Sequence, residues 1–372
     1  MQLSVIILNY NVRYFLEQCV LSVQKALEDI DGEIIIIDNA SSDDSCEMMK
    51  TKFPHIKLIE NAANLGFPKG NNIGVAQAKG DYVCILNPDT VVAEDTFSKI
   101  LNTKNWQLNI GIIGCKLIDG AGNFLPESKR GVPTPWVAFT KIFGLYKISN
   151  YFGKYYAQHL SENESGKVDI LVGAFMMMKR ELYLKVGGFD ENCFMYSDDI
   201  DLSYLVLKTG KSNYYFHETS VIHYKGESTV RDGTYMKRFR EAMQFFYKKH
   251  FNKSWFFDVM MQVGSFVFSL LKKNQQKNEV RIIEEYVIFS KGNLRLNLPQ
   301  KTTYLSDFNQ FVNQQQKNIE IIFDTTTFSF AEIITFMQLN KSKNLSFKNY
   351  ISSSNYLIGS NNSNDRGQII LL

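Results

Sequence analysis

The chain has 372 residues, more than the about 100–200 residues of one typical domain, so we expect a main domain with an appendage. Its 41 basic residues nearly balance its 38 acidic ones, and a net charge of +3 argues against a general nucleic-acid-binding protein that neutralises phosphates. The five cysteines are odd in number, widely spaced and mostly set in apolar runs. This pattern is typical of reduced thiols in a cytosolic protein and not of a Cys/His metal cluster.

The first half of the chain alternates short apolar runs with amphipathic stretches, which is typical of a parallel α/β sheet. The apolar runs predict strands at residues 3–8, 33–38, 56–60 and 81–87. The amphipathic stretches predict helices at about residues 13–28, 42–53 and 70–78. The first apolar run is short and soon becomes polar, so we interpret it as a buried strand and not as a signal peptide.

Polar segments follow three of the predicted strands. They lie at residues 9–11, 38–44 and 87–90. Ligands of open α/β sheets bind beyond the carboxyl ends of the strands. We therefore expect a binding site at this edge of the sheet.

Residues 120–166 are loop-like and rich in aromatic side chains. A helix in this stretch would carry an apolar face made of Trp136, Phe139, Ile142, Phe143 and Tyr146, with Lys141 and Lys147 at its edges. Such a face fits an interfacial membrane-binding segment, and it also fits a lid or acceptor loop that packs on the domain. The sequence leaves both interpretations open.

A second apolar run, at residues 255–271, has lysines on both sides. It is slightly shorter than the about 20 residues of a membrane span, and it contains Asp258 and Gln262. We favour a helix that lies in the cytoplasmic leaflet with its basic flanks on anionic headgroups. A buried core helix is the alternative.

These patterns divide the chain into three parts. We predict a main α/β domain at residues 1–252, an apolar membrane-associating helix with its linker at 253–278, and a small α/β accessory domain at 279–372. The accessory domain has strand patterns at residues 286–290, 319–324, 345–347 and 368–372, and helix patterns at about 307–316 and 331–339. It carries no chemical motif.

Two segments at the predicted ligand edge carry groups that suit a nucleotide. Asp38 ends an apolar strand, where its carboxylate is placed to accept hydrogen bonds from a base N–H or a ribose hydroxyl; a simple turn or helix cap is the alternative. Further along, Gly66 permits close backbone approach to a ligand, and Lys69 is placed to meet a diphosphate.

Asp89 follows the rigid Pro88 at the end of another buried strand. Such a carboxylate is suited to bind a Mg²⁺ or Mn²⁺ ion that bridges a diphosphate, although a proline-initiated turn explains the same residues. His223 follows a later strand-like stretch, and a lone histidine is usually structural. We expect it to be a second metal ligand only if it faces Asp89.

Three carboxylates, Asp198, Asp199 and Asp201, stand at the start of an amphipathic helical pattern that stops at Gly210. Acids are favoured there by the helix dipole, with Ser197 or Asp198 as the cap, so a plain capped helix is one interpretation. A catalytic cluster is the other.

Seven segments, in this order, resemble the family 2 glycosyltransferases of the GT-A fold, particularly the rhamnosyltransferase-like members. They are SVIILNYN, IIIIDNASSDDS, NLGFPKGNNIG, LNPDTVV, GAFMMMKR, GGFDENCFMYSDDIDLSY and HYKGEST. The resemblance covers about residues 1–251, and several motifs in the right order are far more specific than any one.

The resemblance implies a role for each of these segments. Asp38 would contact the nucleotide base of the donor, and Asn87 and Asp89 stand at the DxD position of the family. Asp89 and His223 would then hold the divalent cation. The remaining donor-binding residues would be Asn9, Asn11, Asn64, Gly66, Lys69 and Asn72.

The acidic cluster matches the Glu-Asp position of the family, with Asp198 standing for the Glu and Asp199 for the catalytic Asp. Asp199 would be the general base that takes the acceptor hydroxyl proton. Gly173 and Ala174 would form part of the acceptor floor, and Asp201 would orient the base or bind acceptor hydroxyls.

We therefore expect an inverting glycosyltransferase that uses a nucleotide-sugar donor, with dTDP-rhamnose favoured over a UDP-hexose. Its acceptor would be a lipid-linked saccharide at the inner face of the cell membrane, where the cytoplasmic enzyme would be peripheral. A nucleotidyltransferase and a non-catalytic saccharide-binding or scaffold protein are the rivals. The accessory domain would dock a partner enzyme, mediate self-association in a homodimer or steer the acceptor.

Overall fold

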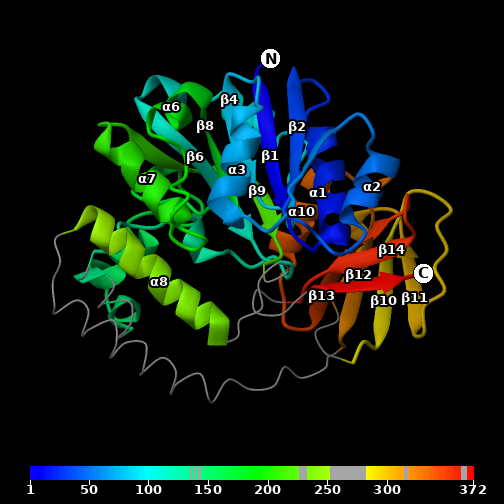
Figure 1. Ribbon diagram of the computed structural model, residues 1–372. Coiled ribbons are helices and arrows are strands. Elements are labelled where there is room, and N and C mark those ends of the chain that lie inside the picture. Colours follow the sequence, from blue (N-terminus) through cyan, green and yellow to red (C-terminus); the bar gives the residue numbers. More distant parts are fainter. Residues whose placement is uncertain are drawn as a thin grey trace.

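The computed structural model describes residues 1–134, 136–137, 140, 144–225, 233–251, 282–313, 317–361 and 367–372 (Figure 1). Within these residues the chain forms two sheets with helices around them. The first sheet has nine strands and the second has six. The predicted α/β fold class is therefore confirmed.

The first sheet has the order β3-β2-β1-β4-β8-β6-β9-β5, and β7 pairs with β9. Its strands are β1 Leu3–Asn9, β2 Gly32–Asp38, β3 Lys57–Glu60, β4 Tyr82–Leu86, β5 Thr90–Val91, β6 Ile110–Ile118, β7 Gly166–Val168, β8 Phe175–Lys179 and β9 Ser212–His223. The four predicted strands are parallel, whereas β8 runs antiparallel to both β4 and β6. The sheet is therefore mixed and not purely parallel.

Helices cover both faces of this sheet because successive side chains of a strand point to opposite faces. Val5 and Ile7 of β1 pack in a core with α1 and α2, whereas Ile6 and Leu8 pack in another with α3 and α7. The α-helices are α1 Arg13–Ala26, α2 Ser45–Lys52, α3 Gly66–Ala76, α4 Thr96–Leu101, α6 Arg180–Lys185, α7 Asp198–Lys208 and α8 Gly233–His250. Short 3₁₀ helices lie at η1 Lys104–Gln107, η2 Pro126–Ser128, η3 Leu145–Lys147 and η4 Asn150–Tyr156.

The second sheet has the order β11-β10-β12-β13-β14-β15. Its strands are β10 Glu285–Phe289, β11 Lys301–Leu305, β12 Ile319–Asp324, β13 Leu345–Ile351, β14 Tyr356–Gly359 and β15 Gln368–Leu371, with η5 Phe308–Gln310 and α10 Phe330–Leu339 as its helices. The first four strands of the order are parallel, β14 pairs antiparallel with β13, and β15 pairs antiparallel with β14.

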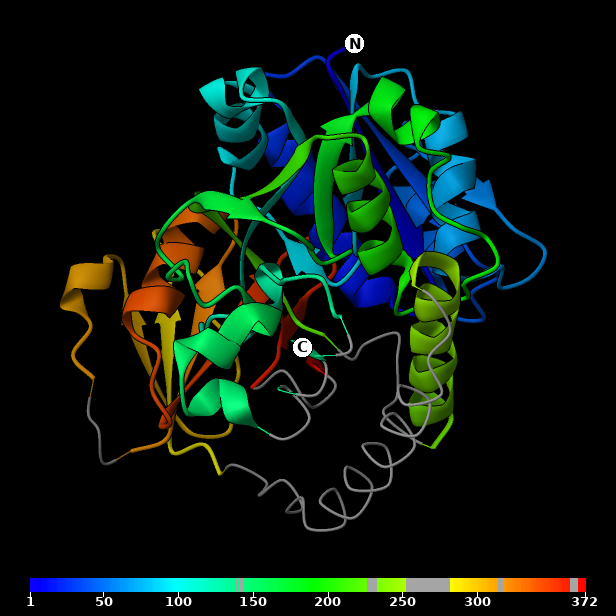
Figure 2. The same cartoon turned by 90° about the vertical axis from the view of Figure 1, so that its left-hand side faces the viewer.

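The second sheet shares a hydrophobic core with the first. Phe15 of α1, Val91 of β5 and Tyr224 pack in one cluster with Ile333 and Phe336 of α10. At the same boundary, both carboxylate oxygens of Glu94 accept hydrogen bonds from the first backbone N–H groups of α10, at 2.8 and 2.9 Å. Figures 1 and 2 show this sheet and α8 on different sides of the molecule.

Several predicted elements differ from the structure. Of the helix predicted at about 307–316, the described residues 307–313 form the single 3₁₀ turn η5, because Phe308 and Phe311 turn into an aromatic cluster with Phe289. Strand β6 was not predicted. Most of the predicted apolar face around Trp136, and the whole run 255–271, lie outside the described residues. Among the residues that are described, no helix is both long and apolar enough to cross a membrane.

Candidate active site

The carboxyl ends of β1 and β2 lie side by side, which brings Asn9 and Asp38 together. The Asn9 amide donates to Asp38 Oδ2 at 2.7 Å, and the backbone N–H of Ser41 donates to Asp38 Oδ1 at 2.7 Å. Both side chains are buried, and Asn9 Oδ1 has no hydrogen-bond partner among the described residues. Asp38 is therefore held in one orientation at the edge predicted for ligand binding.

The loop after β1 is tied to the loop after β2. Asn11 has a left-handed backbone, with φ of 55°, and its N–H donates to Ser41 Oγ at 2.9 Å. In return, the N–H of Ser42 donates to Asn11 Oδ1 at 2.7 Å. Asn11 therefore helps to fix the loop that carries Asp38, and its own carboxamide oxygen is occupied.

Asn64 and Gly66 form the turn that leads into α3. Asn64 Oδ1 accepts from the Gly66 N–H at 3.0 Å, and Asn39, next to Asp38, donates to Asn64 Oδ1 at 3.3 Å. Gly66 has φ of +81°, and a Cβ at this position would lie 2.8 Å from the ring of Phe194. Glycine is therefore required there by both the backbone and the close approach of Phe194.

The two remaining predicted residues of α3 face different surroundings. Lys69 is exposed. Asn72 accepts from the Tyr183 hydroxyl at 2.6 Å and from the Phe189 N–H at 3.1 Å, and it donates to the carbonyl of Phe189 and to Glu191. Every polar atom of the Asn72 side chain is thus engaged within the protein, in a contact between α3 and the 189–191 loop.

Asp89 and His223 face each other across the β5–β9 pair. The register places Thr90 opposite His223, and Asp89 Oδ1 lies 3.4 Å from His223 Nε2. Both residues are buried. Asn87 also approaches the imidazole, with its amide nitrogen 3.4 Å from His223 Nε2. The condition set by the sequence, that His223 should face Asp89, is met.

The donor atoms of this group suit a divalent cation. Two adjacent ligands of an octahedral ion at about 2.1 Å stand about 3 Å apart, close to the Asp89–His223 separation of 3.4 Å. Asn87 Oδ1 and His223 Nδ1 are buried without hydrogen-bond partners among the described residues. The described residues hold no group of three or more His, Cys, Asp or Glu side chains that could bind a metal, so this pair would need oxygens from a ligand or water to complete the shell.

Gly173 and Ala174 connect this group to the acidic helix. The Ala174 carbonyl accepts from the Asn87 N–H at 3.1 Å, and the Gly173 N–H donates to Asp199 Oδ2 at 3.1 Å. A Cβ on Gly173 would lie 3.4 Å from the Asp199 Cβ. The start of α7 is therefore fixed against the carboxyl end of β4.

Asp199 forms a buried ion pair with Arg130, a residue that the sequence did not single out. Arg130 Nη2 lies 2.5 Å from Asp199 Oδ2 and donates to the Leu171 carbonyl at 3.0 Å. The Arg130 backbone exchanges two 2.9 Å hydrogen bonds with Ile170, just before the Gly173 segment. No donor among the described residues contacts Asp199 Oδ1, so that oxygen remains available to a ligand.

Asp198 lies in a less polar environment than its neighbour. Burial, with the nearby Asp199 charge as the second cause, raises the pKa of Asp198 from 3.8 to about 7. Its Oδ1 is buried with no hydrogen-bond partner among the described residues. Ser197 is the N-cap of α7, but its side chain makes no capping hydrogen bond, and its hydroxyl contacts Cys193 instead.

Asp201, the third acid of α7, is paired with α8. It is fully buried, and its two oxygens contact Lys249 Nζ at 2.8 Å and His250 Nε2 at 2.5 Å. Both partners lie at the end of α8. Asp201 therefore joins α7 to α8.

Comparison with known proteins identifies the family of this chain. The model of glycosyl transferase family 2 matches residues 4–187. The chain belongs to glycosyl transferase family 2. This family 2 enzyme is therefore a transferase, as predicted, and its mixed sheet agrees with the GT-A fold expected from the sequence.

Two relatives of this glycosyltransferase are rhamnosyltransferases. It is 26% identical over 241 residues to the N-acetylglucosaminyl-diphospho-decaprenol L-rhamnosyltransferase of Mycobacterium tuberculosis, covering 62% of this chain and 78% of that protein. It is 27% identical over 222 residues to rhamnosyltransferase WbbL of Escherichia coli K12, covering 54% and 78%. The rhamnosyltransferase-like branch predicted from the sequence is confirmed.

A solved structure is similar at a greater distance. The mannosyltransferase PcManGT from Pyrobaculum calidifontis, in complex with GDP-Man and Mn²⁺, is 16% identical with a TM-score of 0.47, over 74% of this chain and 76% of that chain.

Proposed function

We propose that this glycosyltransferase is an inverting enzyme that moves a sugar from a nucleoside-diphosphate donor to a hydroxyl of a lipid-linked saccharide in cell-surface polysaccharide synthesis. Rhamnose is the sugar favoured by the two relatives, one of which is named for a lipid-diphosphate acceptor. The observation that carries the proposal is the Gly173–Ala174 segment, which joins Asn87 on the donor side to Asp199 on the acceptor side.

The donor would lie along the carboxyl ends of the strands. Asp38, oriented by Asn9, would accept hydrogen bonds from the nucleotide, and Lys69 would neutralise part of the diphosphate charge. Asp89 and His223, 3.4 Å apart, would hold Mg²⁺ or Mn²⁺. When bound, the ion would stabilise negative charge on the departing nucleoside diphosphate.

Asp199 would act as the general base. Its Oδ1 would take the proton of the acceptor hydroxyl. At the same time the hydroxyl oxygen attacks the anomeric carbon, and the bond from that carbon to the diphosphate breaks on the opposite face. Arg130 and the Gly173 N–H hold Oδ2, which leaves the other oxygen to the acceptor. Asp201 and Asn72 are left out of the substrate contacts, because their side chains are occupied within the protein.

We propose the inner face of the cell membrane as the place of the reaction, where the enzyme would be peripheral. A lipid-linked saccharide stays in the bilayer, so the enzyme must approach the headgroups to reach its hydroxyl. Self-association in a homodimer stays a prediction.

The proposal is tested by measuring nucleoside diphosphate release from a panel of dTDP- and UDP-sugars with Mg²⁺ or Mn²⁺ and a lipid-linked saccharide acceptor. We expect release from one donor, with loss of about 10²-fold or more in the D199N and D89A variants. The variant D95N, which changes a surface carboxylate paired with Lys99, is the matched control and should keep full activity.

The stereochemistry of the product separates the inverting mechanism from its alternative. The anomeric configuration, read by NMR, should be opposite to that of the donor. A product with retained configuration would contradict a single displacement by the acceptor hydroxyl with Asp199 as the general base. Failure to release nucleotide from any donor would favour a non-catalytic saccharide-binding protein instead.

A further inference from the structure

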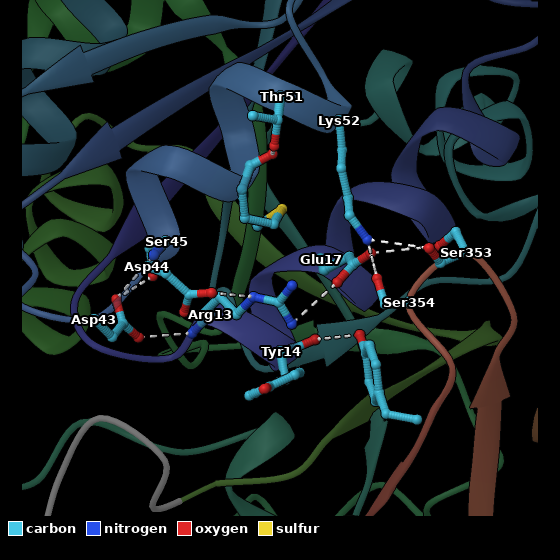
Figure 3. Close-up of polar contacts among 12 residues, drawn as sticks. Arg13, Tyr14, Glu17, Asp43, Asp44, Ser45, Thr51, Lys52, Ser353 and Ser354 are labelled. Carbon is cyan, nitrogen blue, oxygen red and sulfur yellow. Dashed lines mark hydrogen bonds and ion pairs between the residues drawn. The ribbon is translucent and has the colours of Figure 1, made fainter. Parts of the chain in front are cut away.

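A buried carboxylate, Glu17 of α1, stands where the two sheets meet (Figure 3). Lys52 Nζ lies 2.8 Å from Glu17 Oε1, and Arg13 Nη1 lies 3.5 Å from Oε2. The turn between β13 and β14 adds two hydroxyl donors to Oε1, from Ser353 at 3.4 Å and from Ser354. The turn of the second sheet thus supplies part of the polar environment of Glu17, a fully buried carboxylate on a helix of the first sheet.

Arg13 extends this cluster to the loop after β2. Its Nε lies 3.1 Å from Asp44 Oδ2, and its backbone N–H donates to Asp43 Oδ2 at 3.0 Å. The other oxygen of Asp43 accepts from the N–H and the hydroxyl of Ser45. One arginine therefore ties the start of α1 to residues 43–45, and Glu17 holds that arginine from the opposite side.

Residues 43–45 continue directly from the part of the loop that holds the proposed donor contacts. The Ser41 N–H binds Asp38 and the Ser42 N–H binds Asn11. A shift of residues 43–45 would therefore move the backbone groups that orient Asp38. The path from the second sheet to the donor edge runs through hydrogen bonds and ion pairs as far as residues 43–45, and along the backbone from there to residues 41–42.

Two further contacts fix the same turn to the first sheet. Lys52, at the end of α2, donates to the Ser353 carbonyl at 3.2 Å. The Tyr356 hydroxyl donates to the Tyr14 carbonyl at 3.0 Å, and the two rings pack edge to face with centroids 4.9 Å apart. The turn therefore contacts both α1 and α2, the two helices that flank the loop.

We propose that the 353–354 turn is a brace for donor binding, with Ser353, Ser354, Glu17 and Arg13 as positioning residues that hold loop 41–45 in its binding conformation. This inference rests on the proposed function and assigns a role to the second sheet. The residues act through Asp38 and do not touch the reacting atoms.

The full-length variant S353A/S354A tests the brace, because it removes the two hydroxyls and leaves every charge in place. We expect its Kd for dTDP or UDP with Mn²⁺, measured by calorimetry, to rise about five- to tenfold, since hydrogen bonds to a buried charge are lost. The donor KM should rise by a similar factor, with kcat changed less than about twofold.

The variant K25M is the matched control. Lys25 also joins α1 to the second sheet, through the Thr325 carbonyl at 2.9 Å and the ring of Phe330, but it lies at the far end of α1 from the loop. K25M should leave nucleotide binding unchanged. If it weakens binding as much as S353A/S354A does, the effect is general loosening of the two sheets and the brace is refuted.

Amide hydrogen exchange gives a readout that does not depend on substrate. In S353A/S354A the backbone amides of residues 41–45 should exchange faster than in the wild type, whereas those of α4 should not change. Unchanged exchange in the loop, or unchanged nucleotide affinity, overturns the brace. A wild type that binds no nucleotide overturns the proposed function instead, and loop exchange then still decides whether the brace exists.

Discussion

Replacing Asp198 by asparagine should make the protein more stable at neutral pH, although the residue lies in the proposed active site. Burial raises the pKa of this carboxyl from 3.8 to about 7. A shift of about 3 units corresponds to about 4 kcal/mol of unfavourable free energy when the folded protein carries the charge. Asparagine has a similar shape and no charge, so it removes this cost.

The sign follows from the two protonation states. Well below pH 3.8 Asp198 is protonated in both the folded and the unfolded chain, and it carries no penalty. Between pH 3.8 and about 7 the unfolded chain releases this proton and the folded chain keeps it, so stability from this group falls as pH rises. The penalty is about 2 kcal/mol at pH 5 and reaches about 4 kcal/mol at pH 8.

Urea unfolding of the wild type and D198N at pH 5 and pH 8 measures the effect. The advantage of D198N should be about 2 kcal/mol larger at pH 8 than at pH 5. D201N is the control on the same helix: it breaks a buried ion pair with Lys249 and His250, so it should lose about 2 kcal/mol or more. An advantage of D198N that does not grow with pH would refute the reasoning.

Three further variants probe other contacts. R130Q should lower kcat about 10²-fold and change the nucleotide Kd less than twofold, because Arg130 orients the general base Asp199. An unchanged kcat in steady-state kinetics would contradict this role. H223A should raise the Mn²⁺ concentration for half-maximal activity about tenfold, and a metal titration identical to the wild type would exclude His223 as a ligand. E94Q should lower the free energy of unfolding by about 1 kcal/mol, because the carboxylate that caps α10 is lost. Denaturant titration measures this change, and an unchanged free energy would show that the charge of the cap does not stabilise the protein.

The strands at the donor edge could be predicted because each contains a short, mostly apolar and buried run, such as residues 34–37 of β2. Strand β6 could not, because Gly111 and Gly114 interrupt its apolar pattern. A Cβ at Gly111 would lie 2.2 Å from Val206 Cγ1, and one at Gly114 would lie 2.7 Å from Leu171 Cδ2. The glycines weaken the local strand signal, but tertiary packing requires them.

The motifs mark most of the segments that the structure brings together at the candidate site, but not the direction of each side chain. Asn72 and Asp201 lie in these segments, yet their side chains contact partners inside the protein. Arg130 has no motif of its own, and it reaches Asp199 through a backbone bridge with Ile170 far along the chain. Such pairings depend on tertiary geometry that periodicity does not encode.

The hydrophobic cluster shared by the two sheets also bears on how the chain melts. Because α10 and β5 bury the same apolar surface, neither sheet can lose its structure without exposing part of the other. All three tryptophans, Trp106, Trp136 and Trp255, precede the second sheet. Because Trp106 packs against the core of the first sheet, its fluorescence reports on that sheet, and its transition should coincide with that of far-ultraviolet circular dichroism, which reports on both sheets.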